Sequence, residues 1–176
     1  MTFLTKNILS TLAIIGFLAG PATGQDHVDS AAGANLIAPL QINKVDDLYF
    51  GVIAPSLTTA STVQVLRSEL NMSICGAELT CFEPGNRSQF VITGEANKFV
   101  TLSNPGSITV SNENGDTMVV DSFVGGGAAD DTYWGGRRLI ESDGSVGFKI
   151  GAKLYVGANQ PIGAYTGTFT ITAEYE

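Results

Sequence analysis

The regular alternation of side chains near the end of the chain constrains the fold more than any other feature. From Tyr165 to Tyr175, apolar or small residues alternate with threonines and one glutamate. Side chains of a β-strand point alternately to its two faces, so this stretch predicts one long strand with an apolar face and a threonine-lined face. The apolar face carries Tyr165, Gly167, Phe169, Ile171, Ala173 and Tyr175.

Shorter stretches of the same kind occupy most of the remaining chain. Strands are expected at residues 36–42, 48–53, 62–67, 70–74, 88–94, 99–102, 107–110, 116–123 and 148–156. Turns are expected at Asp46-Asp47, at residues 83–86 and at Asn114-Gly115, where the residue types favour turn conformations. Pro39 lacks a backbone N–H, which places the first strand at a sheet edge or at a break. With no helical periodicity beyond the N-terminus, about nine or ten short strands predict an all-β antiparallel sandwich or barrel.

The N-terminus has the composition of a secretory signal peptide. Lys6 precedes a nearly unbroken apolar run over residues 8–20, and small residues follow up to Gly24. The run is too short for a comfortable membrane span. The mature protein is therefore expected in the periplasm, on the cell surface or outside the cell. The expected parts are a signal peptide at residues 1–24, a flexible segment at residues 25–34 and a β-sandwich domain at residues 35–176.

The chain is acidic. It contains 17 Asp and Glu residues against 9 Lys and Arg, which gives a formal net charge of −8. A surface of this sign offers little to nucleic acid or to anionic lipid, so neither is expected as a partner. The acidic residues are spread over turns rather than gathered in a block, which is typical of a surface that keeps the protein soluble.

The two cysteines, Cys75 and Cys81, are expected to form a disulfide, since they are a lone pair in an exported protein. A zinc site would need more ligands than the single His27 could add, and a redox pair usually has two residues between its cysteines. The bond would close the loop of residues 76–80 and join two neighbouring strand ends.

Residues typical of catalysis are scarce. A hydrolytic triad needs a histidine, and His27 lies in the segment that is expected to be flexible. Carboxylates could serve glycoside cleavage, but those present occupy glycine-rich loops, where acidic residues ordinarily form turns. They are Asp130, Asp131, Glu141 and Asp143. We expect a protein without enzymatic activity, cofactor or bound metal.

The longest irregular connection, residues 125–138, carries the most distinctive surface cluster. Tyr133 and Trp134 stand close to Arg137 and Arg138 in the sequence. Exposed aromatic residues beside arginine can bind a glycan or a protein partner. The alternative is that Trp134 folds back over the end of the sandwich, and the sequence leaves both interpretations open.

Three stretches together carry a family resemblance: residues 48–53, Leu-Tyr-Phe-Gly-Val-Ile; residues 88–94, Ser-Gln-Phe-Val-Ile-Thr-Gly; and residues 148–175. They resemble a family of exported bacterial β-domains of unknown function, which is similar in turn to spore coat U and archaic chaperone–usher pilin subunits. The ending also matches the C-terminal pattern of chaperone–usher pilins. Gly163 is fourteenth from the end, apolar residues alternate after it, and Tyr175 is penultimate.

The resemblance implies an immunoglobulin-like antiparallel β-sandwich that lacks its last strand. A periplasmic chaperone, and then the N-terminal extension of an identical or related subunit, would fill the resulting apolar groove by adding a strand. The residues expected along this groove are Gly163, Tyr165, Phe169, Ile171, Ala173 and Tyr175.

The sequence departs from the pilin pattern in its N-terminal segment. A donated strand should alternate apolar side chains, whereas Val28 is the only sizeable apolar residue between Gln25 and Leu36. Two functions therefore stay open. One is a pilin-like structural subunit that assembles by strand donation on the bacterial surface. The other is a self-contained monomeric envelope domain that binds a glycan or a protein through residues 125–138.

Overall fold

The computed structural model describes residues 26–68, 73–126 and 137–176. The chain divides into a first unit, Met1–Asn35, and a compact second unit, Leu36–Glu176. Residues 26–35 contain neither helix nor strand.

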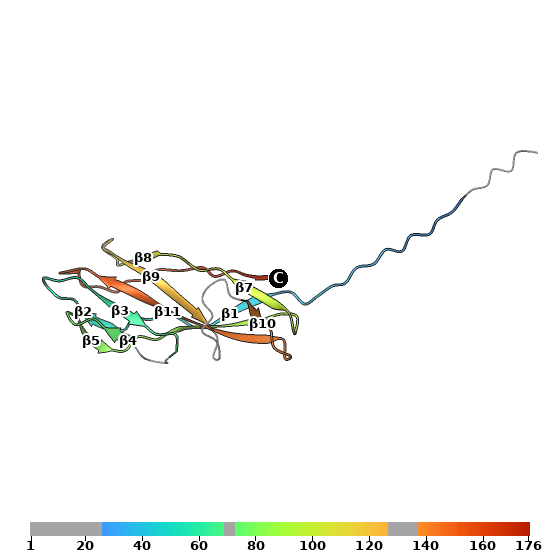
Figure 1. Cartoon of the computed structure of the whole chain (residues 1–176). Coiled ribbons are helices and arrows are strands. Elements are labelled where there is room, and N and C mark those ends of the chain that lie inside the picture. The colour runs from blue at the N-terminus through green and yellow to red at the C-terminus, as the bar shows by residue number, and fades with distance from the viewer. Residues whose placement is uncertain (1–25, 69–72, 127–136) are drawn as a thin grey trace, which may run out of the picture. The chain divides into compact units, whose positions relative to one another are not determined.

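The second unit consists of strands joined by turns and loops (Figure 1). None of the described residues lies in a helix, so the all-β prediction is confirmed. The strands are β1 (Gln41–Asp46), β2 (Val52–Ala54), β3 (Ser61–Val65), β4 (Ser73–Cys75), β5 (Thr80–Glu83), β6 (Ser88–Thr93), β7 (Phe99–Leu102), β8 (Ile108–Ser111), β9 (Thr117–Gly126), β10 (Arg138–Leu139), β11 (Ser145–Val156) and β12 (Ala173–Tyr175).

The long strand β11 is the centre of the largest sheet. On one edge its first half pairs with β6 and its second half with β3, while β9 pairs along the other edge. β1 lies beyond β6 at an edge, and β4 lies beyond β3. The strand expected at residues 36–42 begins only at Gln41, so Pro39 lies outside β1. β8 continues the sheet on the far side of β9. The two smaller sheets are β10-β7-β12 and β2-β5, and all the pairings are antiparallel, as in a β-sandwich.

The core follows from the alternation along β11. Phe148, Ile150 and Leu154 are buried, whereas Lys149 and Lys153 point outward and are only half-buried. β3, β6, β7 and β9 each add buried side chains to the same cluster. Those are chiefly Val63, Ile92, Val100, Leu102, Val120 and Phe123.

One long ribbon joins residues 41–54 to residues 80–93. Its antiparallel pairing runs from Gln41 opposite Thr93, through Tyr49 opposite Asn86, to Ala54 opposite Thr80. β1 and β2 therefore run in one direction, and β5 and β6 run in the other. The turns predicted at Asp46-Asp47 and at residues 83–86 are wrong. Turn-forming residues also suit bulges and interruptions of a ladder, and here the register shifts without reversing the chain.

The final segment, residues 162–172, has fewer hydrogen bonds than the sequence predicts. Only Ala173–Tyr175 forms a ladder, with β7, and Thr166 forms an isolated bridge with Ser111 at the end of β8. The prediction of one long paired strand is therefore wrong for most of its length. The alternation itself is present, because the apolar residues from Tyr165 to Tyr175 are half-buried and the threonines between them are exposed. The pattern reports which side chains face the core, and it says nothing about the partners of the backbone.

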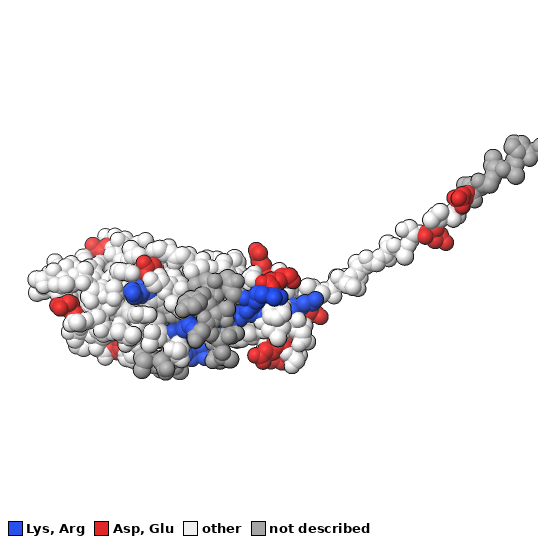
Figure 2. Space-filling model, in the orientation of Figure 1, with Lys and Arg blue, Asp and Glu red and all other residues white. Residues whose placement is uncertain are grey.

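The surface is mixed in charge. On the face drawn in Figure 2, acidic side chains are scattered rather than gathered in one block. The described parts of the chain contain no helix that is long and apolar enough to cross a membrane.

Candidate functional site

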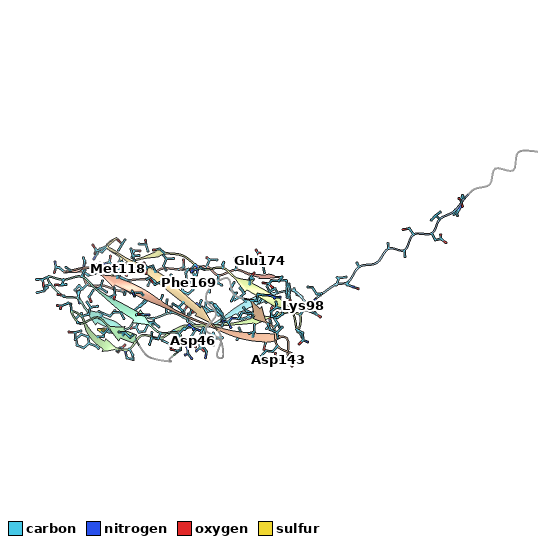
Figure 3. The ribbon with its side chains drawn as sticks, viewed as in Figure 1. Asp46, Lys98, Met118, Asp143, Phe169 and Glu174 are labelled. Atoms are coloured by element: carbon cyan, nitrogen blue, oxygen red, sulfur yellow. A yellow bond between two sulfur atoms is a disulfide. The ribbon has the colours of Figure 1, made fainter. Side chains whose placement is uncertain are left out.

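A cavity of about 670 Å³ opens between the final segment and the stretch that follows β1. One wall is formed by residues 48–55 and the other by residues 162–169, and we call the space between them the groove. Its floor comes from β8, β9 and β11. Met118 of β9 and Phe169 of the second wall, both labelled in Figure 3, line the space. Voids inside a packed core rarely exceed the size of a water molecule, so the groove is not a packing defect.

The lining of the groove is apolar. Leu48, Phe50 and Ile53 come from the first wall, and aliphatic side chains from the three floor strands complete it. Among the lining residues, all of which are described, Asp47 is the only Asp, Glu, Lys, Arg or His. General acid–base chemistry needs positioned titratable groups, and this surface suits the burial of apolar side chains instead.

The second wall exposes an unpaired backbone edge to the groove. Thr166 exchanges two hydrogen bonds with Ser111, each 2.9 Å long. In an antiparallel pair the residues on either side of such an exchange direct their N–H and C=O groups to the opposite edge. The backbone groups of Tyr165 and Gly167 therefore face the groove, and they form no backbone hydrogen bond with any described residue.

The first wall is arranged in the same way. Tyr49 exchanges hydrogen bonds of 2.8 and 2.7 Å with Asn86, which turns the backbone groups of Leu48 and Phe50 toward the groove. Within the described ranges these two residues also lack a backbone partner. The groove is thus bounded on both sides by strand edges that can each accept another strand.

The two walls run in opposite directions. The first wall continues β1, and successive antiparallel pairings lead from β1 through β6, β11, β9 and β8 to the final segment. A strand placed in the groove would therefore pair antiparallel with one wall and parallel with the other. If the added strand ran antiparallel to the final segment, then β8, the final segment and the added strand would follow one another as an antiparallel meander.

The six residues expected along the groove fall into two groups. Gly163, Tyr165 and Phe169 line it. Ile171, Ala173 and Tyr175 lie beyond its end, where they pack against the core cluster, and the last two belong to β12. The groove therefore ends near Phe169, because the residues after it pack against the core and end in β12, which pairs with β7.

Aromatic contacts fix the side chain at this end of the groove. The ring of Phe169 lies 5.1 Å from the ring of Phe123 and 6.3 Å from that of Phe90, measured between centroids. At the other end, the hydroxyl of Tyr165 donates to the carbonyl of Pro161 at 2.7 Å and accepts from Nε2 of Gln160 at 2.9 Å. Both ends of the second wall are thus held by their side chains, while Thr166 is the one residue between them whose backbone pairs with a described residue.

The predicted ligand loop is largely outside the described residues. Tyr133 and Trp134 fall within residues 127–136, outside the described residues. Arg137 forms an ion pair with Glu176, and its guanidinium lies 4.0 Å from the ring centroid of Phe99. Arg138 is buried, with its guanidinium 5.9 Å from the ring centroid of Phe148. Both arginines are engaged within the domain.

Of the carboxylates considered for catalysis, Glu141 and Asp143 are described, and both lie in the turn that precedes β11. The side chain of Asp143 accepts hydrogen bonds of 2.9 Å from the backbone N–H and the hydroxyl of Ser145. These bonds hold the pKa of Asp143 below its usual value, which keeps the carboxylate charged. Asp143 stabilises the turn and does not line the groove.

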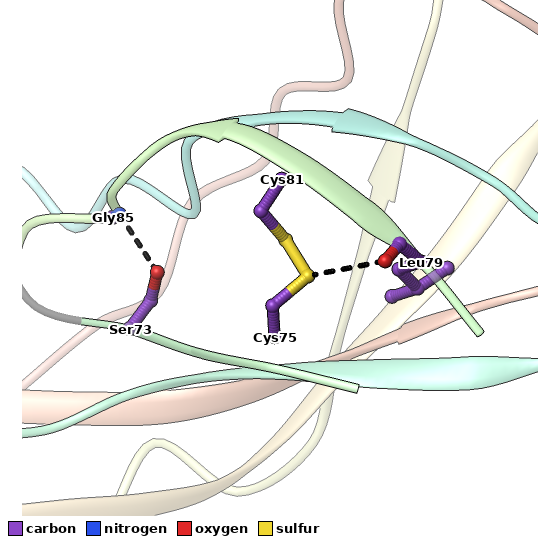
Figure 4. The surroundings of a disulfide bond; sticks show 5 residues. All are labelled: Ser73, Cys75, Leu79, Cys81 and Gly85. Atoms are coloured by element: carbon purple, nitrogen blue, oxygen red, sulfur yellow. Dashed lines mark hydrogen bonds between the residues drawn. A yellow bond between two sulfur atoms is a disulfide. The ribbon is translucent and has the colours of Figure 1, made fainter. Parts of the chain in front are cut away.

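Cys75 and Cys81 form a disulfide, with their Cα atoms 6.2 Å apart (Figure 4). The bond joins the end of β4 to β5, as the loop between the two cysteines predicts. Because β5 pairs with β2, the disulfide connects to the first wall of the groove through one strand.

Sequence reasoning missed the first wall and the floor. In the sequence, Leu48 and Phe50 belong to an expected strand and to the family resemblance, and Met118 belongs to an expected strand, but none of the three is predicted to line a groove. The available signal was the break in the first ribbon at Gly51, whose φ of +97° interrupts the ladder. A side chain there would also lie 2.1 Å from the carbonyl oxygen of Glu83. Such a glycine marks a wall that approaches its neighbour closely.

Comparison with known proteins places the chain in a family but gives it no characterised relative. No curated protein and no solved structure matches the chain significantly. The sequence pattern of one family, described as a domain of unknown function (DUF4402), matches residues 40–175 and so covers both walls and the floor of the groove. The chain belongs to the DUF4402 family.

Proposed function

We propose that this protein is a non-enzymatic, exported structural subunit that assembles by β-strand donation on the bacterial surface. The observation that carries the proposal is the apolar groove between two unpaired strand edges. A strand added there would complete both edges with main-chain hydrogen bonds and would place alternate side chains on the apolar floor. The resemblance of the ending to pilin subunits supports the same function.

The donor is the N-terminal segment of another copy. Residues 26–35 lie outside the compact second unit and contain no strand of their own. Every second residue from Val28 to Leu36 is apolar or small, namely Val28, Ser30, Ala32, Ala34 and Leu36. When the segment is extended, these five side chains share one face, which can lie on the floor of the groove.

The reach of the chain favours a neighbouring copy over the same molecule. The segment enters the second unit at Ala38, whose carbonyl accepts a hydrogen bond from Tyr175. From Tyr175 back to Phe169 the final segment spans roughly 20 Å at about 3.3 Å per residue. After removal of a signal peptide at residues 1–24, the free segment would reach roughly 40 Å from Ala38, and about half of that length is used before the groove begins at Phe169. Only the first half of the segment, up to about Ser30, could then enter its own groove, whereas the segment of a neighbouring copy can place all five side chains on the floor. A periplasmic chaperone is the expected partner for the groove before assembly.

The test uses the protein without residues 25–35 and a synthetic peptide of residues 26–37. We expect the shortened protein to be monomeric, and we expect the peptide to bind it and to raise its melting temperature, because ligands of the native state stabilise that state. A peptide with aspartate at positions 28, 32 and 36 is the matched control and should not bind. Light scattering gives the oligomeric state, and calorimetry gives the affinity.

Strand donation would be wrong if the full-length mature protein stayed a monomer at high concentration and the peptide left the melting temperature of the shortened protein unchanged. The groove would then need another occupant.

A further inference from the structure

We infer that the Cys75–Cys81 disulfide holds the first wall of the groove in position, so that the groove accepts a strand only when the disulfide is formed. The inference rests on the proposed function for the nature of the occupant, and on the contacts of the wall for the rest. Forming the bond removes two electrons and two protons from the two thiols. A disulfide-exchange partner of the exporting compartment accepts them.

The first wall depends on β5 and the residues after it. β2 pairs with β5, and within the described chain this is its only ladder. Tyr49 pairs with Asn86, three residues beyond the end of β5. Gly51 also lies against Glu83, the last residue of β5, because a Cβ on Gly51 would be 2.1 Å from the carbonyl oxygen of Glu83.

β5 has few backbone connections to the main sheet, although Cys81 packs against the core cluster. Apart from the ladder with β2, it pairs with no other described strand. The disulfide joins Cys81 to Cys75 on β4, which pairs with β3 in the main sheet (Figure 4). Nearby, the backbone N–H of Gly85 donates to the hydroxyl of Ser73 at 3.0 Å, and the N–H of Leu79 donates to the carbonyl of Gly76 at 3.0 Å. Of these three connections, the disulfide and the two hydrogen bonds, only the disulfide is covalent.

The consequence of reduction is local. A two-stranded ribbon is at best marginally stable in water, so the β2–β5 ribbon needs its attachment to the main sheet. The loop that the disulfide closes is short, and short loops contribute less to the stability of the whole domain than long ones. β11 and its neighbours keep their own ladders and the buried core when the bond is broken. Reduction therefore opens the ribbon by local unfolding while the rest of the domain stays folded.

Amide hydrogen exchange of the mature protein, with and without a phosphine reductant, tests this inference directly. On reduction, we expect the protection of the amides in β2 and β5 to fall by about tenfold or more, with the protection of β9 and β11 retained. A Cys75→Ser, Cys81→Ser double variant should exchange like the reduced protein and should not respond to the reductant. Unchanged protection of β2, or loss of protection throughout the domain, overturns the inference.

Binding of the peptide of residues 26–37 separates this inference from the proposed function. We expect reduction to weaken binding to the protein lacking residues 25–35 by about tenfold or more, since one of the two pairing edges is lost. If the peptide fails to bind even the oxidised protein, strand donation by this segment is wrong, and the exchange data still decide whether the disulfide holds the wall. Equal binding to both forms overturns the inference alone.

Discussion

The hydroxyl of Tyr175 joins three parts of the domain at one point. It donates to the carbonyl of Ala38 at 2.9 Å and accepts from the backbone N–H of Glu95 at 2.6 Å. The carboxylate of Glu95 in turn accepts from the N–H of Ala38 at 3.0 Å. Gly94 leaves room for this contact, because a Cβ there would lie 2.2 Å from the hydroxyl. The C-terminus, the start of the domain and the turn after β6 are thus fixed together.

We expect Tyr175→Phe to lower the free energy of unfolding by about 1–3 kcal/mol, because a partly buried donor and a partly buried acceptor both lose their partner. Tyr165→Phe is the matched control, since its hydroxyl also makes two hydrogen bonds but lies nearer to solvent. We expect that control to cost less than about 1 kcal/mol. Urea denaturation measures the free energy of unfolding of both variants. Equal losses in the two would show that the contacts of the Tyr175 hydroxyl stabilise the domain no more than those of the Tyr165 hydroxyl.

The sequence identified Tyr175 as an inward-facing residue and assigned it to the groove. The orientation follows from alternation, which is a local property. The partner does not follow, because Ala38 is 137 positions away, and no local pattern encodes a contact at that distance. The same limit explains why the disulfide was predictable from two cysteines and their compartment, whereas its connection to β2 was not.

Among the elements, the final segment shows most clearly what alternation can and cannot predict. Its apolar side chains face the core as expected, yet the backbone between Thr166 and β12 lacks a continuous ladder. Close approach to β8 accounts for one fixed point, since a Cβ on Gly167 would lie 2.7 Å from the carbonyl oxygen of Thr109. The segment is a strand with one edge partly supported by β7 and β8 and the other edge open to the groove.

Strand β9 offers a matched pair of substitutions that test the floor. Met118 faces the groove, and its neighbour Val119 points outward, because adjacent residues of a strand face opposite sides. We expect Met118→Lys to abolish binding of the peptide of residues 26–37. The variant should stay folded, because the long lysine side chain can reach solvent through the open groove.

Val119→Lys should bind the peptide like the unmodified protein. Calorimetry measures the affinities, and circular dichroism confirms that both variants are folded. Unimpaired binding by Met118→Lys, or an equal loss in Val119→Lys, would place the peptide somewhere other than on this floor.

At the scale of the whole molecule, the groove is a seam at which the curled sheet does not close. The all-β class was predictable because strand alternation and turn residues recur along the entire chain. The seam was not predictable from composition or spacing, because it depends on which strand edges remain unpaired in the folded domain and on which of them face each other. Only the resemblance to pilin subunits suggested it, and the free backbone edges at Leu48, Phe50, Tyr165 and Gly167 give it a physical basis.

Closing the seam within one molecule gives the last prediction. In this variant, residues 26–37 are moved from the N-terminus to a position after Glu176, joined by a Gly/Ser linker of about eight residues that spans the roughly 20 Å from Tyr175 back to Phe169. The added strand would turn back from β12 and run antiparallel to the final segment, which directs Val28, Ala32 and Leu36 into the groove. A tethered ligand acts at an effective concentration in the millimolar range, so a peptide of micromolar affinity would add about 4 kcal/mol of stability. We expect the melting temperature to rise by roughly 8 °C or more.

The variant should stay monomeric in light scattering and should no longer bind added peptide. The same fusion with aspartate at the positions of Val28, Ala32 and Leu36 should melt like the shortened protein. If both fusions melt at the same temperature, the groove does not take this strand.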